Sequence, residues 1–296
     1  MSATPVTKRS FLRGGPTSSR EYGPVLSLLL VAPLLVLLFG GFLYPIAGLF
    51  WGSVFAPEAT AKHYLRIFQE PLYLLILWRT FELAFIVTAL AFLLGYPVAL
   101  AMTRVSGRAA MLIGACVLIP LWTSVLVRSY AWIVLLQRNG VVNNTLHEAG
   151  LIEAPLQLLY TQGAVVVAMT QVLLPFMVMP IYSVVSGIPD DLTKAARNLG
   201  AGNLQAFLRI TLPLSLPGVA AGVLITFILS LGFYITPALV GGPGTLMMST
   251  MIGQQTTELL NWPFAGALSA VLLVATLLLV IVFRRTLALN KGFKLG

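Results

Sequence analysis

The sequence predicts an all-α polytopic membrane protein with six transmembrane helices. Its 296 residues are 58% hydrophobic and only 9% charged, and the mean hydropathy is +0.93. The apolar residues form long runs, and the basic residues stand at the ends of these runs rather than on one face. A bilayer needs about 20 apolar residues per spanning helix, whereas no water-soluble domain can bury so large an apolar fraction. The net charge of +9 therefore points to a membrane and not to nucleic acid.

The first apolar run extends from Val25 to about Phe50. It is longer than the hydrophobic region of a signal peptide and lacks a small-residue cleavage pattern, so we expect an uncleaved, irregular span. A mixed segment with a short amphipathic piece follows it. Prolines inside the later runs predict kinks. The other five spans are expected at about Phe81–Met102, Ala109–Leu136, Gly163–Val185, Leu214–Tyr234 and Pro263–Phe283.

The basic residues predict the orientation of these spans. Of the 18 Lys and Arg residues, 13 fall on one side: four in 1–24, two at 104–108, three in 189–217 and four from 284 onward. Loops rich in Lys and Arg stay in the cytoplasm. We therefore expect a multi-pass protein of the bacterial inner membrane with both termini cytoplasmic. The expected organisation is a tail over 1–24, a membrane domain over 25–284 and a tail over 285–296.

Residues 189–217 form a polar, helix-forming segment between two apolar runs. Asp190 or Asp191 is expected to cap a helix, and Gly200 to end it in the left-handed conformation. A second short helix is expected from about Asn203, before Pro213 and Pro217. The apolar residues recur at helical spacing, which predicts a docking platform for another protein, although a solvated loop is the simpler alternative. These apolar residues are Leu192, Ala195, Ala196 and Leu199 in the first helix and Leu204, Phe207 and Leu208 in the second.

The same segment resembles the EAA motif of ABC importer permeases. KAARNLG at 194–200 is followed by nine residues and then by Ile210, Leu212 and Pro213. Lys194 stands where that family usually has Glu. The resemblance implies that this segment couples the permease to an ATPase. The coupling residues that it implies are Lys194, Ala195, Ala196, Gly200, Leu204, Phe207, Ile210, Leu212 and Pro213.

Four further segments resemble the permeases of spermidine/putrescine-type ABC importers: 118–136, 140–146, 174–183 and 233–243. The resemblance implies a type I ABC importer permease fold that moves a small polar solute by alternating access. It also implies a second, typically non-identical permease, two ATPase subunits that bind ATP and Mg, and a periplasmic substrate-binding protein. Many relatives carry an acidic residue before the Thr-Pro of the fifth span, and LGFYITP here has none. A polyamine-like solute and an anionic or zwitterionic one, such as an amino-acid derivative, both remain open.

Ionisable and polar residues inside spans are candidates for the substrate pathway. Arg128 is expected either to line a cavity or to snorkel or pair between helices, and an unneutralised Arg128 would repel a cation. Glu82 is expected at the membrane interface, paired with Arg79, or on the pathway. Gln171 would bond across helices or face the solute. The candidate pathway residues are Glu82, Trp122, Arg128, Tyr130, Trp132, Gln171 and Tyr234.

The sequence lacks the motifs that carry enzymatic chemistry. It contains no HExxH, no GxSxG and no P-loop, so we expect a transport subunit without its own ATP hydrolysis or cofactor. The single Cys116 and the separated His63 and His147 predict no metal centre. An ion-coupled secondary transporter and a membrane scaffold are the alternatives from other classes, and the former would need further ionisable residues at mid-membrane.

Overall fold

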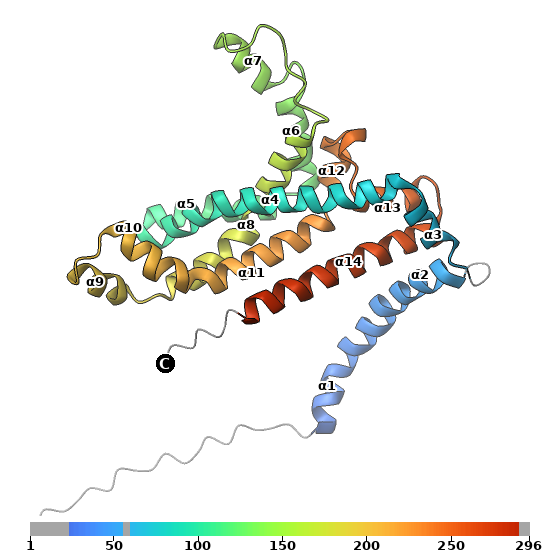
Figure 1. The fold of residues 1–296 in the computed structure, drawn as a ribbon, viewed down its shortest axis with the longest axis horizontal. Coiled ribbons are helices and arrows are strands. Elements are labelled where there is room, and N and C mark those ends of the chain that lie inside the picture. The colour runs from blue at the N-terminus through green and yellow to red at the C-terminus, as the bar shows by residue number, and fades with distance from the viewer. Residues whose placement is uncertain (1–23, 56–59, 290–296) are drawn as a thin grey trace, which may run out of the picture. The chain divides into compact units, whose positions relative to one another are not determined.

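The computed structural model describes residues 24–55 and 60–289, all of them helical or in short connections (Figure 1). Of the predicted tails over 1–24 and 285–296, residues 1–23 and 290–296 lie outside these ranges, whereas residues 285–289 continue the last helix instead of belonging to a tail. The chain forms two compact units, one ending at Gly48 and the other beginning at Leu49. In the first unit, α1 (Pro24–Val36) leads through a π-helical stretch, η1 (Leu37–Leu43), into α2 (Tyr44–Phe55), whose residues from Leu49 onward belong to the second unit. The predicted irregularity of the first span is thus a π-helical stretch, and it contains Gly40 and Gly41.

The second unit contains the remaining described elements. They are α3 (Lys62–Gln69), α4 (Pro71–Arg104), α5 (Arg108–Trp122), α6 (Val125–Leu136), α7 (Val141–Glu148), α8 (Gln162–Ser186), α9 (Asp190–Asn198), α10 (Asn203–Ala206), the π-helical η2 (Phe207–Thr211), α11 (Leu212–Leu231), α12 (Ile235–Val240), the 3-10 turn η3 (Pro243–Thr245), α13 (Met248–Thr257) and α14 (Trp262–Leu289).

Five helical segments of the described residues are long and apolar enough to cross a membrane. The predicted span at 109–136 is different, because α5 and α6 meet at an angle of 103°. We predicted one helix there with Pro120 near its middle. Instead α5 ends two residues after Pro120, and Ser124 begins a new helix by accepting a hydrogen bond from Leu126 N at 3.2 Å. Six spans result when this bent pair counts as one, which confirms the predicted fold. The five segments are Leu26–Phe55, Pro71–Arg104, Gln162–Ser186, Asn203–Leu231 and Trp262–Arg285.

The core of the second unit is the contact among α4, α8 and α11. Gly218 and Gly222 of α11 stand four residues apart and face α8. A Cβ atom on Gly218 would lie 2.7 Å from the Pro180 carbonyl oxygen, and one on Gly222 would lie 3.0 Å from that of Met177. Small residues at this spacing let two membrane helices approach closely. The G-x-x-x-G spacing at 218–222 is the signal in the sequence from which this contact could have been predicted.

A second cluster joins α3, α4, α13 and α14 around the buried Phe264 and Leu268. The amphipathic piece predicted near His63–Phe68 is α3, and its Ile67 is fully buried in this cluster. Arg66 lies over the Phe264 ring at 4.9 Å and bonds to Glu70 at 3.0 Å. The cluster therefore anchors the start of α4, which begins ten residues earlier than the span predicted from Phe81.

Candidate functional site

The polar segment after α8 folds into the helix α9. We expected Asp190 or Asp191 to cap it, and that was wrong, because Pro189 occupies the N-cap and no side chain bonds to the free amides. Pro189 has φ −61° and ψ 129°, so its fixed ring presets the turn into the helix. The two aspartates stand in the first turn instead, where the helix dipole favours negative charge.

Gly200 ends α9 as predicted. It has φ +89°, its N–H bonds to the Arg197 carbonyl at 2.9 Å, and the Ala201 N–H bonds to the Ala196 carbonyl at 3.0 Å. These two bonds form a Schellman motif, which needs a residue in the left-handed conformation. The cap fixes the direction in which the chain leaves α9.

The helix α9 buries none of its residues in the rest of the chain. Its polar side lines a hollow of about 560 Å³ against the ends of α4 and α8. Its apolar side faces away, and Leu199 is 89% exposed. A surface helix normally buries its apolar stripe in its own protein. The chain itself therefore leaves uncovered the face that a partner could bury. The polar residues at the hollow are Asp190, Thr193, Lys194 and Arg197.

The second half of the segment is not a separate short helix, which corrects our prediction. Residues 203–231 form one continuous helix, because the π-helical turn η2 precedes Pro213. The Leu212 N–H bonds five residues back to Phe207, and this wider turn accommodates the proline without a break. The loop after α9 thus leads directly into a membrane span.

The predicted coupling residues divide between two environments. Leu204 is 70% exposed, whereas Phe207 is half-buried with its ring edge-on to Tyr96 at 6.0 Å. Phe207 and Leu212 pack against the α4–α8–α11 core, so their side chains belong to the protein interior. Lys194 bonds to Asp191 at 3.3 Å, and Ala195 and Pro213 are exposed. A second hollow, of about 360 Å³, is lined by Ala196, Leu199, Gly200, Ala201, Gln205, Ala206, Arg209 and Ile210.

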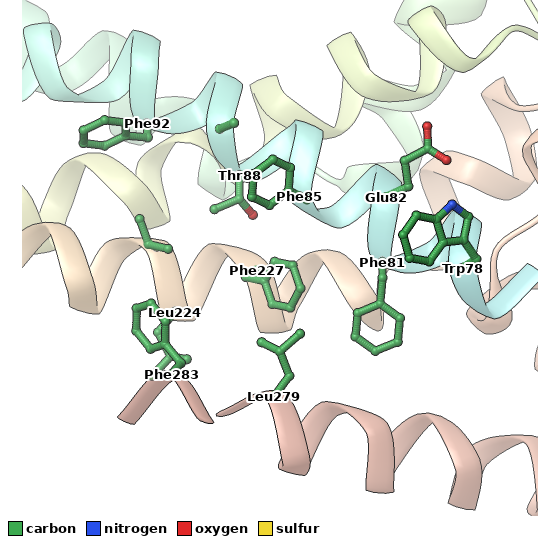
Figure 2. A pocket seen from close by; sticks show the side chains of 12 residues that line it. Trp78, Phe81, Glu82, Phe85, Thr88, Phe92, Leu224, Phe227, Leu279 and Phe283 are labelled. Carbon is green, nitrogen blue, oxygen red and sulfur yellow. The ribbon is translucent and has the colours of Figure 1, made fainter. Parts of the chain in front are cut away.

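A different hollow, of about 600 Å³, lies among α4, α11 and α14 (Figure 2). Six aromatic side chains line it, and Glu82 with Trp78 stands at one end of the row. The predicted pair between Glu82 and Arg79 does not form, and Glu82 instead accepts a long hydrogen bond from Gln162 at 3.5 Å. The Glu82 carboxylate therefore points towards α8 and away from the aromatic side chains (Figure 2). The aromatic residues are Trp78, Phe81, Phe85, Phe92 and Phe227, and Phe283 adds a sixth ring from α14.

The other predicted pathway residues lie elsewhere. The Trp132 indole donates to Gln171 Oε1 at 3.2 Å, so these two side chains bind each other. Trp122 is 85% exposed at the end of α5, and Tyr130 is exposed on α6. Tyr234 lies against Gly253 of α13. Within the residues that the structure describes, none of these lines the hollow of Glu82, and no three His, Cys, Asp or Glu side chains approach closely enough to bind a metal.

Comparison with known proteins identifies this architecture. Residues 91–291 match the family described as binding-protein-dependent transport system inner membrane component, which is more than half of the chain. The chain belongs to this family. The permease is 35% identical over 237 residues to the spermidine/putrescine transport system permease protein PotB of Escherichia coli K12, covering 80% of this chain and 86% of that protein. It is 34% identical over 233 residues to PotB of Haemophilus influenzae, covering 79% of this chain and 81% of that protein.

Solved structures agree on the fold. The permease superposes with a TM-score of 0.70 on a chain of a bacterial ABC transporter that imports the acidic polysaccharide alginate, at 22% identity, covering 88% of this chain and 95% of that chain. A chain of the MetNI methionine ABC transporter superposes with a TM-score of 0.55 at 22% identity, covering 73% of this chain and 96% of that chain. The permease is therefore a multi-pass inner-membrane subunit of an ABC importer and not an enzyme, which confirms the predicted fold and class.

Proposed function

We propose that this permease moves a small organic polycation, of the spermidine or putrescine kind, into the cell by alternating access. The sequence relatives named as spermidine/putrescine permeases support this substrate class. The aromatic side chains of the hollow support it as well, because ring faces attract alkylammonium groups. An anionic or zwitterionic solute is the competing substrate class, and the cationic Arg128 favours it.

The observation that carries the mechanism is the outward apolar face of α9. We propose that Leu192, Ala195 and Leu199 insert into a cleft of an ATPase subunit, with Leu204 beside them. Buried apolar anchors of this kind supply most of the binding energy of a protein interface. Because α10 continues without a break into α11, a displacement of α9 would be transmitted through one short loop to a membrane span.

The proposed assembly contains a second permease subunit, two ATPase subunits that hold ATP and Mg, and a periplasmic substrate-binding protein. ATP binding would bring the two ATPases together and open the pathway outward, and hydrolysis would reset it. The excess of Lys and Arg on the side of α9 supports a cytoplasmic position for α9 and both tails, 1–24 and 285–296.

Replacement of Leu199 by Asp tests the docking proposal. We expect Leu199→Asp to lower both ATPase co-purification and solute uptake at least tenfold, because a charge would have to be buried in an apolar cleft. Leu151→Asp is the matched control, since Leu151 is 71% exposed in the loop after α7. Normal ATPase binding by Leu199→Asp would reject the docking role of α9.

Replacement of Glu82 tests the substrate class. We expect Glu82→Gln to raise the KM for putrescine uptake about tenfold, which corresponds to about 1.4 kcal/mol of lost attraction. Glu153→Gln removes an exposed carboxylate and should leave the KM unchanged. If the assembled importer takes up an anion but not putrescine, the proposed polycation substrate is wrong, and the anionic or zwitterionic solute class takes its place.

A further inference from the structure

The polar hollow between α9 and the helix bundle brings three cationic side chains together. Arg104 is the last residue of α4, whereas Lys194 and Arg197 belong to α9. These two basic residues of α9 are three positions apart, and Asp190 and Thr193 share their side of the helix, so all four line the same hollow. Its volume of about 560 Å³ lies in the range of small-molecule sites.

The charges in this hollow are not balanced among the described residues. Two ion pairs join side chains in the described part of the chain, and neither includes Arg104 or Arg197. Lys194 bonds to Asp191 at 3.3 Å, but this carboxylate is 91% exposed, so water weakens the pair. Asp190 is the one carboxylate in the lining, which leaves an excess of two positive charges. An anion in the hollow would therefore lower the repulsion among the three cations.

The hollow lies where two membrane spans end. The span of α4 ends at Arg104 and that of α8 ends at Ser186, and both residues line the hollow. Pro189 brings the N-terminus of α9 to it, and no side chain caps this N-terminus. Basic pockets at the cytoplasmic ends of spans bind phosphate-bearing lipid headgroups, and a helix N-terminus favours an anion. The position and the charges of the hollow together fit a phosphate group.

We infer that this hollow binds a phosphate group, which Arg104 contacts from the end of α4 and which Lys194 and Arg197 contact from α9. Guanidinium groups bind phosphate oxygens through paired hydrogen bonds, and lysine adds a point charge. Tyr182 and Thr211 add hydroxyl-bearing side chains to the lining. The bound phosphate connects α9 to a membrane span and so restricts the movement of α9 against the bundle.

The phosphate group has two possible sources. One is the headgroup of an anionic lipid such as cardiolipin, whose two phosphodiesters match the excess of two positive charges. The other is a free polyphosphate, since a phosphate monoester alone carries about −1.5 to −2 at pH 7. Binding from either source requires neither the proposed solute nor an attached ATPase, so the inference goes beyond the proposed function.

Ligand binding to the full chain, purified in detergent, tests this site. The probes are cardiolipin, with phosphatidylcholine as the control lipid, and inorganic pyrophosphate, and native mass spectrometry measures the Kd of each. We expect the double variant Arg104→Gln/Arg197→Gln to raise the Kd of the bound probe at least tenfold, because it removes two of the three cations. Arg284→Gln is the matched control, since it removes an exposed arginine near the end of α14 and should leave the Kd unchanged.

A second double variant, Arg104→Lys/Arg197→Lys, separates a loss of charge from a loss of fold. It keeps both charges and should bind the probe more tightly than the Gln variant does. Loss of cardiolipin binding in the Gln variant would identify a lipid headgroup as the source, and loss of pyrophosphate binding would identify a free polyphosphate.

Three results would overturn the inference: binding of neither probe, equal binding of cardiolipin and phosphatidylcholine without pyrophosphate binding, or an equal Kd in the Gln variant and the Arg284→Gln control. The assay contains neither ATPase nor solute, so each of these results leaves the proposed function intact. Conversely, normal ATPase binding by Leu199→Asp would reject the docking role of α9 and leave the phosphate site intact.

Discussion

The indole N–H of Trp132 donates a hydrogen bond to Oε1 of Gln171 across 3.2 Å, joining α6 to α8. The two residues are 39 positions apart in the chain, and both are partly buried. The bond satisfies the only polar atom of the indole and one end of the amide. Since α6 follows a 103° bend, this contact helps to fix the direction in which α6 leaves the bundle.

Removing this hydrogen bond should loosen α6. We expect Trp132→Phe to destabilise the purified permease by about 1 kcal/mol, because membrane-protein hydrogen bonds contribute about that much. Gln171→Leu should have a similar effect, and the double variant should cost less than the sum of the two. Thermal unfolding in detergent measures all three. Additive effects would show that the two side chains do not interact.

The left-handed cap of α9 should tolerate few residues. We expect Gly200→Val to reduce uptake strongly while membrane insertion continues, since a side chain in this conformation costs about 1–2 kcal/mol and a branched one more. Gly200→Asn should keep most activity. Gly202→Ala is the control, because Gly202 has φ −66° and open space around it. Full uptake by Gly200→Val would mean that the cap does not position α9.

The close approach of α11 to α8 should make Gly218 sensitive to a single added methyl group. A Cβ atom there would meet the Pro180 backbone carbonyl, so the helices must separate. We expect Gly218→Ala to cost about 1–3 kcal/mol, the usual range for overpacking, and to lower the unfolding temperature. Gly232→Ala, where a Cβ would find open space, should be near neutral. Equal stability of the two variants would contradict the packing described for Gly218.

His63 gives the permease a pH-dependent contribution to stability. Partial burial lowers the pKa of His63 below 6.5, and the nearby Lys62 and Arg66 lower it further. Below about pH 6.5 the unfolded chain therefore binds more protons than the folded one, and stability falls as the pH drops towards the folded pKa. His63→Gln should flatten this part of the profile of unfolding temperature against pH. An unchanged slope in His63→Gln would assign the effect to another group.

Several features follow from local sequence alone. The apolar runs predicted the membrane spans, and Gly163–Val185 lies within one residue of each end of α8. The glycine at 200 predicted the cap, and the 3.6-residue spacing predicted an apolar stripe on α9. These features depend on hydropathy and backbone preference over a few neighbouring residues, so the order of residues is enough to determine them.

Only the tertiary structure decided which way these features face. The stripe on α9 could have packed inward, and the helix from Asn203 could have ended at Pro213. Glu82 could have paired with Arg79, three residues away, rather than standing beside aromatic rings from three helices. Each outcome depends on contacts between residues far apart in the chain, whose side-chain volumes and free polar groups must fit together. The sequence therefore determined most of the spans, the glycine cap of α9 and the family, whereas the packing of α4, α8 and α11 decided which surfaces are left for partners.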